Sequence, residues 1–301
     1  MCGIIGTAAL VASNKYVGAN NAYLAGRLAE RTLNNSVPYI IPVLDALHDG
    51  FTFLDVGCGP GSITIDIARR FPSATILGLD SGTDAIAMAR ANARIAGVTN
   101  VHFEIGDGLN LAAASNPSSI FDIVLNVNGG FDVVHTHQLH MHVQDASKLM
   151  CELRAAAKPS GGLVCCRESD HGMVAFWPEK ESMKQFVSAI PMMLLGRGQD
   201  PYVGRKFVSH ALAAGCKREN MEASVGTWVY STPEERREWA EVIVGSIQSQ
   251  KKSDQIRNEA ATSGSRGMDM SQGLRDWEDW VQAEDGWYAV PCPRIICRRH
   301  N

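Results

Sequence analysis

The sequence predicts an α/β protein: a doubly wound, mainly parallel sheet with a helical cap built from N-terminal and C-terminal segments. Three observations lead to this fold class. Short apolar runs alternate with amphipathic segments between residues 50 and 105, the first apolar run ends in the glycine-rich turn DVGCGPG, and the composition, with 45% hydrophobic and 20% charged residues, is that of a soluble globular protein. A strand–helix–strand order requires crossover connections, and these place helices on both faces of a parallel sheet.

The elements of the core follow from periodicity and from chain breakers. Residues 50–56 read as a strand, and residues 62–71 take helical spacing, with Ile63, Ile67 and Phe71 on one face. A second strand is expected over 74–79 and a second helix over 84–95, closed by Gly97 as its C-cap. Residues 101–105 supply the third strand. This order defines a βαβαβ unit.

The next strand has two candidates, FDIVL from Phe121 and FDVV from Phe131. We predict the second, because the first would leave a long structureless loop behind it. A helix through Ala156 and a strand over 161–167 then follow, and residues 116–130 form an insertion of unknown role.

The flanking segments read as additions to one sheet domain. Residues 14–47 are expected to be helical, with breaks at Pro38 and Pro42. After the core we expect mostly helix over 173–214, a strand over 225–230, a helix over 233–250, a flexible polar loop over 251–271 and a last strand over 287–297. Trp277 and Trp280 have helical spacing and are expected to pack in a core. The predicted organisation is a helical lid (1–48), a cofactor-binding core (49–170), and cap helices with closing strands (171–301).

Composition excludes several classes of protein. With 28 Lys and Arg against 32 Asp and Glu, the net charge of −4 argues against a general nucleic-acid binder. No apolar run reaches the 18–20 residues or so that span a bilayer, and no basic residue precedes the apolar N-terminus as in a secretory signal. The eight cysteines form no CxxC pair, so no zinc site is expected. We therefore expect a cytoplasmic protein with reduced thiols, and leave open whether it is a monomer or a homodimer.

The glycine turn is the strongest functional signal. Gly57, Gly59 and Gly61 lie between a strand and a helix, where a nucleotide-like ligand approaches the backbone. Asp80 ends the second strand, where a carboxylate can accept ribose hydroxyls, and Asp107 follows the third strand, where an adenine amino group could be recognised. A dinucleotide site would need GxGxxG, whereas the order here is GxGxG, preceded by an acidic residue that suits an ammonium group better than a pyrophosphate.

With these motifs the chain resembles the class I S-adenosylmethionine-dependent methyltransferases, and within them the UbiE-type branch that acts on small molecules, including enzymes of secondary metabolism. The resemblance is carried, in order, by LDVGCGPGSITIDIA, GLDSGTDAIAMA, FEIGDGL, FDVVHTHQLHMHV and PSGGLVCCRESD. It implies S-adenosyl-L-methionine as the cofactor. The implied cofactor contacts are the methionine portion for Gly57, Gly59 and Gly61, its ammonium for Asp55, its carboxylate for Arg31, the ribose for Asp80, the adenosine for Ser81, the adenine for Asp107 and Gly108, and the sulfonium for His135.

Four histidines crowd the exit of the fourth predicted strand, at positions 135, 137, 140 and 142. Convergence of three or four ligands is not assured at this spacing, so no metal site is predicted. We expect His137 or His142 to act as a general base and Gln138 to orient a substrate, because residues at the carboxyl end of a central strand face the ligand crevice. Asp170, His171 and Trp177 are candidate substrate contacts.

The sequence therefore predicts a methyltransferase that acts on a thiol, hydroxyl or amine of a small molecule, in secondary-metabolite biosynthesis and with neither a nucleic acid nor a membrane as its partner. Two alternatives stay open: an NAD-dependent oxidoreductase, and a repurposed or non-catalytic methyltransferase-like protein that binds the cofactor. The N-terminal MCGIIG resembles glutamine amidotransferases that use an N-terminal cysteine. The match covers only six residues, and the sheet predicted after it is of the methyltransferase type. We therefore interpret the match as coincidental and expect that replacing Cys2 leaves activity intact.

Overall fold

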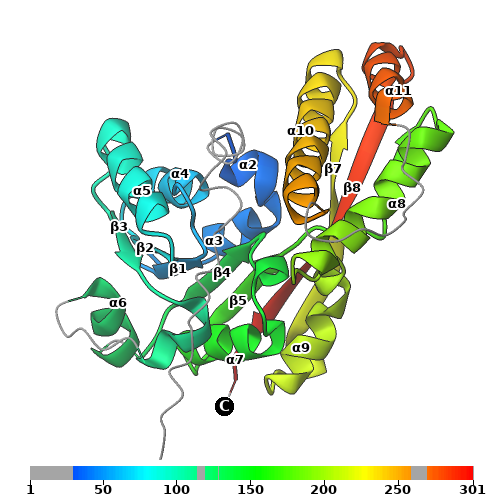
Figure 1. Cartoon of the computed structure of the whole chain (residues 1–301). Coiled ribbons are helices and arrows are strands. Elements are labelled where there is room, and N and C mark those ends of the chain that lie inside the picture. The colour runs from blue at the N-terminus through cyan, green and yellow to red at the C-terminus, as the bar shows by residue number, and fades with distance from the viewer. Residues whose placement is uncertain (1–29, 114–118, 128, 259–269, 301) are drawn as a thin grey trace, which may run out of the picture.

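A single sheet organises the molecule (Figure 1). The computed structural model describes residues 30–113, 119–127, 129–258 and 270–300. In this part of the chain eight strands are ordered β3-β2-β1-β4-β5-β8-β6, and β7 pairs with the other edge of β8. The five central strands are parallel, as predicted: β1 Thr52–Val56, β2 Thr75–Asp80, β3 Val101–Ile105, β4 Val133–His137 and β5 Leu163–Arg167.

Two hydrophobic clusters cover the two faces of the sheet, which confirms the doubly wound arrangement. One cluster packs α4 (Ser62–Arg70) and α5 (Thr83–Ala96) on the sheet, together with α2 (Leu33–Ser36) and α3 (Ile41–Asp45). The other packs α7 (Ala146–Ala156) and α9 (Phe207–Ala213). The adjacent buried Cys165 and Cys166 belong to different clusters, because successive side chains of a strand point to opposite faces.

Local signals set several helix boundaries. α5 ends where Gly97 takes a left-handed conformation with a φ of 66°, as its C-cap. α7 begins where the side chain of Asp145 accepts the Lys148 N–H at 2.8 Å. The predicted strand from Phe131 is confirmed as β4. In the insertion before it, a short helix, α6 (Ile120–Asp122), leads into a π-helix over Ile123–Val127.

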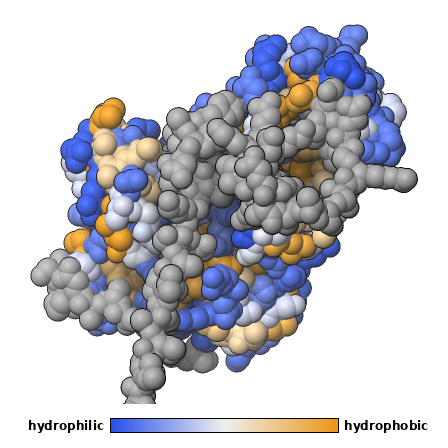
Figure 2. All heavy atoms as spheres, viewed as in Figure 1, coloured by the Kyte–Doolittle hydropathy of each residue, from blue (hydrophilic) through white to orange (hydrophobic). Residues whose placement is uncertain are grey.

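The cap is assembled around one long strand, β8 (Trp287–Arg298). Its C-terminal part pairs with β5, its N-terminal part with β6 (Ala175–Trp177), and its other edge with β7 (Met221–Tyr230). The helices α8 (Glu181–Gly196), α10 (Pro233–Asn258) and α11 (Met270–Gln282) stand around the N-terminal part of β8 (Figure 1). Trp277 and Trp280 are 2% and 0% exposed and pack against Tyr288, as predicted. In the space-filling view, hydrophilic residues dominate the outer surface of these helices (Figure 2).

Of the predictions about the cap, the mostly helical segment over 173–214 is confirmed by α8 and α9 but also contains a strand, and the polar loop was wrong. β6 lies in the segment expected to be mostly helical, because its partner β8 is more than a hundred residues away in the sequence and left no local signal. The expected polar loop over 251–271 is helical at both ends, since α10 continues to Asn258 and α11 begins at Met270. Residues 1–29, which include Cys2 and about the first half of the helical segment predicted over 14–47, lie outside the described residues. None of the described helices combines the length and the apolar character that crossing a membrane requires.

Candidate functional site

The glycine turn after β1 keeps its backbone in the left-handed region. The φ angles of Gly57, Gly59 and Gly61 are 76°, 54° and 79°. A Cβ atom on Gly61 would lie 2.7 Å from the ring of Phe103, and one on Gly57 would lie 2.9 Å from Leu139. At Gly59 a Cβ would meet nothing within 4 Å. Two of the glycines therefore allow close packing, and the third leaves its backbone accessible to a ligand.

Asp80 fixes this turn from the end of β2. Its Oδ2 accepts the Gly59 N–H at 2.9 Å, and its Oδ1 accepts the Gly82 N–H at 2.8 Å. Ser81 is exposed beside it. The carboxylate thus joins the glycine turn to the start of α5, at the edge of the sheet where parallel α/β proteins bind their ligands.

Asp107 occupies the corresponding place after β3. Its Oδ1 accepts the Leu109 N–H at 2.9 Å, and its Oδ2 accepts a hydrogen bond from Asn110 Nδ2 at 2.7 Å. A Cβ on Gly108 would lie 2.9 Å from Val56, so the chain passes close to the end of β1 here. The structure therefore brings Gly59, Asp80 and Asp107 to one edge of three adjacent strands, in the order that the sequence predicted.

Asp55 and His135 form a buried pair beneath the turn. They are cross-strand neighbours on β1 and β4, and Asp55 Oδ1 lies 2.9 Å from His135 Nδ1. Because an ionised carboxylate only accepts hydrogen bonds, Nδ1 is the protonated nitrogen of the ring. Asp55 Oδ2 accepts a hydrogen bond from Thr64 Oγ1 at 2.6 Å, so both carboxylate oxygens are engaged within the protein. The opposite ring nitrogen, His135 Nε2, is buried without a hydrogen-bond partner.

Arg31, His137, Arg167 and Trp228 form a second group, which we call the Trp228 cluster. The guanidinium carbon of Arg167 lies 4.3 Å from the Trp228 ring centroid, and that of Arg31 lies 5.3 Å from it. The ring of His137 meets the indole edge to face at 5.7 Å, and both of its nitrogens are buried without partners. Burial, together with the charges of the two arginines, lowers the pKa of His137 well below its usual value. His137 is therefore a neutral imidazole at pH 7.

The sequence analysis missed Glu168, which follows β5 and is fully buried. Its Oε2 accepts the Met141 N–H at 3.2 Å, and its Oε1 accepts the Ser169 N–H at 3.0 Å. Burial raises the pKa of Glu168 to about 7, although these hydrogen bonds oppose the shift. The signal available in the sequence was a carboxylate directly after the strand that begins with the apolar run Leu163–Cys166.

Gln138 is hydrogen-bonded to the carboxylate of Glu168. It adopts a left-handed conformation with a φ of 57°, which is uncommon outside glycine. In the amide orientation that satisfies every partner, it donates to Glu168 Oε1 at 2.9 Å and to Ser169 Oγ at 3.1 Å. The structure thus places Gln138 as a support of the loop after β4, with its amide engaged by the protein.

Of the remaining predicted residues, some lie near the carboxyl edge of the sheet and one lies far from it. His142 Nδ1 lies 2.7 Å from Gln199 Nε2, and burial lowers the pKa of His142 to about 4. His171 Nε2 lies 3.3 Å from Ser169 Oγ, and burial likewise lowers its pKa to about 4. The charge of His171 also contributes to lowering the pKa of His142, so the two rings lie near each other. The carboxylate of Asp170 is fully buried and forms an ion pair with Arg205, whose Nε lies 2.6 Å from Asp170 Oδ2.

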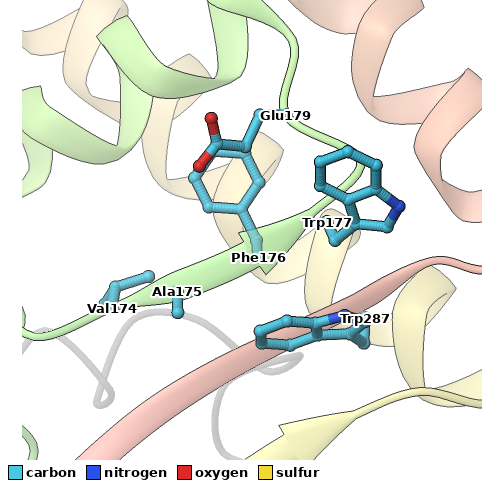
Figure 3. Close-up of a pocket in the computed structure, with 6 residues that line it drawn as sticks. All are labelled: Val174, Ala175, Phe176, Trp177, Glu179 and Trp287. Carbon is cyan, nitrogen blue, oxygen red and sulfur yellow. The ribbon is translucent and has the colours of Figure 1, made fainter.

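Trp177 lies in a separate surface pocket on the cap, shown in Figure 3. Trp177 pairs with Trp287 of β8, and Arg167 pairs with Arg294 of the same strand. These two positions on β8 are seven residues apart. Seven residues of strand correspond to about 23 Å. The structure therefore does not bring Trp177 together with the other candidates. This pocket has a volume of about 480 Å³ and is lined by Val174, Ala175, Phe176, Trp177, Glu179 and Trp287.

Metal ligation has no support among the described residues, where no group of three or more His, Cys, Asp or Glu side chains is arranged to hold an ion. Among the four neighbouring histidines, His140 turns away into the core. Its Nε2 lies 3.1 Å from Thr136 Oγ1, and its ring packs edge to face on Phe207.

Comparison with known proteins agrees with this geometry. Residues 47–202, about half of the chain, match the family described as "Methyltransferase domain". An uncharacterised methyltransferase of Schizosaccharomyces pombe is 27% identical over 230 residues, which cover 74% of this chain and 76% of that protein.

A solved structure shows the same fold. The YcgJ protein of Bacillus subtilis aligns with a TM-score of 0.52 at 14% identity, over 87% of this chain and 97% of that protein. A phosphoethanolamine N-methyltransferase of Haemonchus contortus, solved with S-adenosylhomocysteine, aligns at 19% identity with a TM-score of 0.49, and this alignment spans only 52% of that protein. The family match decides against the NAD-dependent oxidoreductase. The chain belongs to the methyltransferase domain family and is a class I methyltransferase that depends on S-adenosylmethionine.

Proposed function

We propose that the protein methylates a sulfur, oxygen or nitrogen atom of a small molecule, in a specialised biosynthetic pathway of the kind served by UbiE-like enzymes. The observation that carries this proposal is the position of His137. It ends the strand next to β1, beside the glycine turn, and its unpartnered ring is enclosed by the Trp228 cluster. Such an enclosed position suits a small acceptor better than a polymer, and the net charge of −4 also disfavours nucleic acids.

The residues at the carboxyl edge of the sheet fit S-adenosylmethionine. Gly59 leaves room for the cofactor against the backbone, and Asp80 and Asp107 end the two neighbouring strands, where ribose and adenine would be bound. The cofactor, when bound, supplies a methyl group activated on a sulfonium. In this proposal the buried Asp55–His135 pair holds the floor of the site, with His135 Nε2 facing the cofactor.

The protein's own contribution to the transfer is alignment, exclusion of water and removal of a proton. In-line displacement gains most from holding the acceptor in position, and the burial of His137 and Arg167 keeps water away from them. We assign proton removal to His137, because its nitrogens are unpartnered whereas His142 Nδ1 is taken by Gln199. The depressed pKa keeps His137 unprotonated at pH 7, which is the form that a general base requires.

The test is a transfer assay with radiolabelled S-adenosylmethionine and a panel of small thiols, phenols and amines. His137→Gln should lower turnover of the best acceptor at least a hundredfold, the range of general-base catalysis, and leave S-adenosylhomocysteine affinity within twofold. The control is His102→Gln, an exposed histidine on β3, which should change neither. If the cofactor binds and no acceptor is methylated, the protein is the non-catalytic alternative. If His137→Gln keeps full turnover, the assignment of the base is wrong.

A further inference from the structure

The guanidinium of Arg167 is buried, and no acidic side chain among the described residues forms an ion pair with it. The residue is 4% exposed, and its Nη1 has no hydrogen-bond partner. Burial lowers the pKa of Arg167 from its usual value, as expected for a charge removed from water. A buried cation without compensation is costly, so such a group is usually completed by a ligand or a partner charge.

The nearby carboxylates are already used. Glu168 accepts backbone hydrogen bonds from Met141 and Ser169, Asp170 pairs with Arg205, and Asp55 pairs with His135. Arg294, on the adjacent strand, donates to Ser224 Oγ at 2.7 Å. Within the described part of the chain, positive charge therefore gathers here without a free acidic side chain to match it.

Other unpartnered donors face the same region. The hydroxyl of Tyr39 is buried without a partner, and the Arg294 guanidinium lies 5.3 Å from its ring. Burial raises the pKa of Tyr39 well above its usual value, although the charges of Arg167 and Arg294 oppose the shift, so the hydroxyl keeps its proton and can donate. Together with His137, these groups form a set of hydrogen-bond donors beside the flat indole of Trp228.

This set lies on the acceptor side of the site. Arg167 is on β5, two strands from the glycine turn on β1, or about 10 Å at the usual strand spacing. His137 lies on the strand between them and is the cross-strand partner of Arg167. A group bound by Arg167 is therefore separated from the cofactor's glycine turn by the residue to which we assign proton removal.

We propose that the methyl acceptor carries a carboxylate and that Arg167 binds it. The planar guanidinium matches a carboxylate in a bidentate geometry, and the Trp228 indole offers a face for a flat ring attached to it. This inference rests on the proposed function of the same site, and it narrows the acceptor from any small molecule to an organic acid.

The experiment is calorimetric titration of the full chain saturated with S-adenosylhomocysteine, using three matched probes: phenylacetate, phenylacetamide and phenethylamine. Phenylacetate should bind, and the neutral amide and the cationic amine should each bind at least tenfold more weakly. Arg167→Gln should weaken phenylacetate at least tenfold and leave S-adenosylhomocysteine affinity within twofold. Arg167→Lys should give an intermediate loss of phenylacetate affinity, since lysine keeps the positive charge but lacks the planar donors that bind a carboxylate in a bidentate geometry. The control is Arg298→Gln, an exposed arginine at the far end of β8, which should change neither affinity.

The two proposals fail in distinguishable ways. If S-adenosylhomocysteine does not bind, the proposed function itself fails. If it binds, the inference is overturned when the amide or amine binds as well as the acid, when none of the probes binds, or when Arg167→Gln retains phenylacetate affinity. If Arg167→Gln weakens S-adenosylhomocysteine instead, Arg167 holds the methionine carboxylate and the inference is also wrong. Thermal unfolding without ligand distinguishes a ligand-binding role of Arg167 from a structural one. The Arg167→Gln variant should unfold at the same temperature as the parent or higher, because it removes an unpaired buried charge.

Discussion

Gly61→Ala should mainly lower the stability of the fold, whereas Gly59→Ala should mainly weaken cofactor binding. Both glycines are in the left-handed region, where a Cβ costs about 1–2 kcal/mol. At Gly61 the new methyl would also lie 2.7 Å from the Phe103 ring, and overpacking of this kind adds about 1–3 kcal/mol. We therefore expect Gly61→Ala to lower the free energy of unfolding by about 2–5 kcal/mol, and Gly59→Ala to lower it by only about 1–2 kcal/mol.

Binding should reverse this order. The Cβ on Gly59 projects into space that the protein leaves empty, so Gly59→Ala should weaken S-adenosylhomocysteine at least tenfold while the fold is retained. Urea unfolding and calorimetric titration measure the two effects on the same samples. Phe103→Leu provides a control, because a smaller side chain should recover part of the stability lost in Gly61→Ala and none of the binding lost in Gly59→Ala.

Two results would refute this reasoning. Unchanged S-adenosylhomocysteine affinity in Gly59→Ala would mean that the empty space above the turn is not where the cofactor lies. Equal destabilisation by the two substitutions would mean that the contact with Phe103 is relieved at no cost, and that backbone conformation alone explains the glycines.

Three further predictions concern other parts of the molecule. Asp80→Ala removes the acceptor for the Gly59 N–H and should weaken S-adenosylhomocysteine at least tenfold by calorimetry; parent-like affinity would contradict the site assignment. Burial lowers the pKa of His140 to about 3, so the unfolded chain binds the extra proton below about pH 6.5 and stability falls on acidification. In His140→Phe the loss of unfolding free energy between pH 7 and pH 5, measured in urea, should be smaller by about 2 kcal/mol, and an unchanged slope would exclude this linkage. Burial raises the pKa of the Cys58 thiol well above its usual value, so mass spectrometry after brief iodoacetamide treatment at pH 8 should find the exposed Cys151 alkylated and Cys58 intact; a labelled Cys58 would show that the turn opens.

The core of the fold could be predicted because its signals are local. The strands β1, β2 and β5 each contain a short apolar run, the helices between β1 and β3 have clear spacing, and Gly97 ends α5 where its left-handed conformation is needed. β6 could not be predicted, because the three residues of this strand are held by β8 alone. The C-terminal end of α10 is polar, and no periodic pattern marks it as helical.

The candidate site divides in the same way. The proposed cofactor half is built from strand ends and the turn between β1 and α4, so Gly59, Asp80 and Asp107 could be read from sequence order. The proposed acceptor half joins Arg167, Trp228 and Tyr39 from three distant segments. Trp228 shares a face with Arg167 only because β8 runs antiparallel between β5 and β7, and the sequence carried no signal for that register.

The continuity of β8 limits how this enzyme can move. One unbroken strand is hydrogen-bonded to the catalytic sheet at its C-terminal end and to the cap at its N-terminal end. A hinge between the two would have to break strand pairing, so the cap cannot swing open as a rigid lid. Passage of small molecules must therefore depend on movements smaller than a domain. By the same reasoning, evolution can exchange α8 and α11 to suit new acceptors without shifting the frame that holds the cofactor.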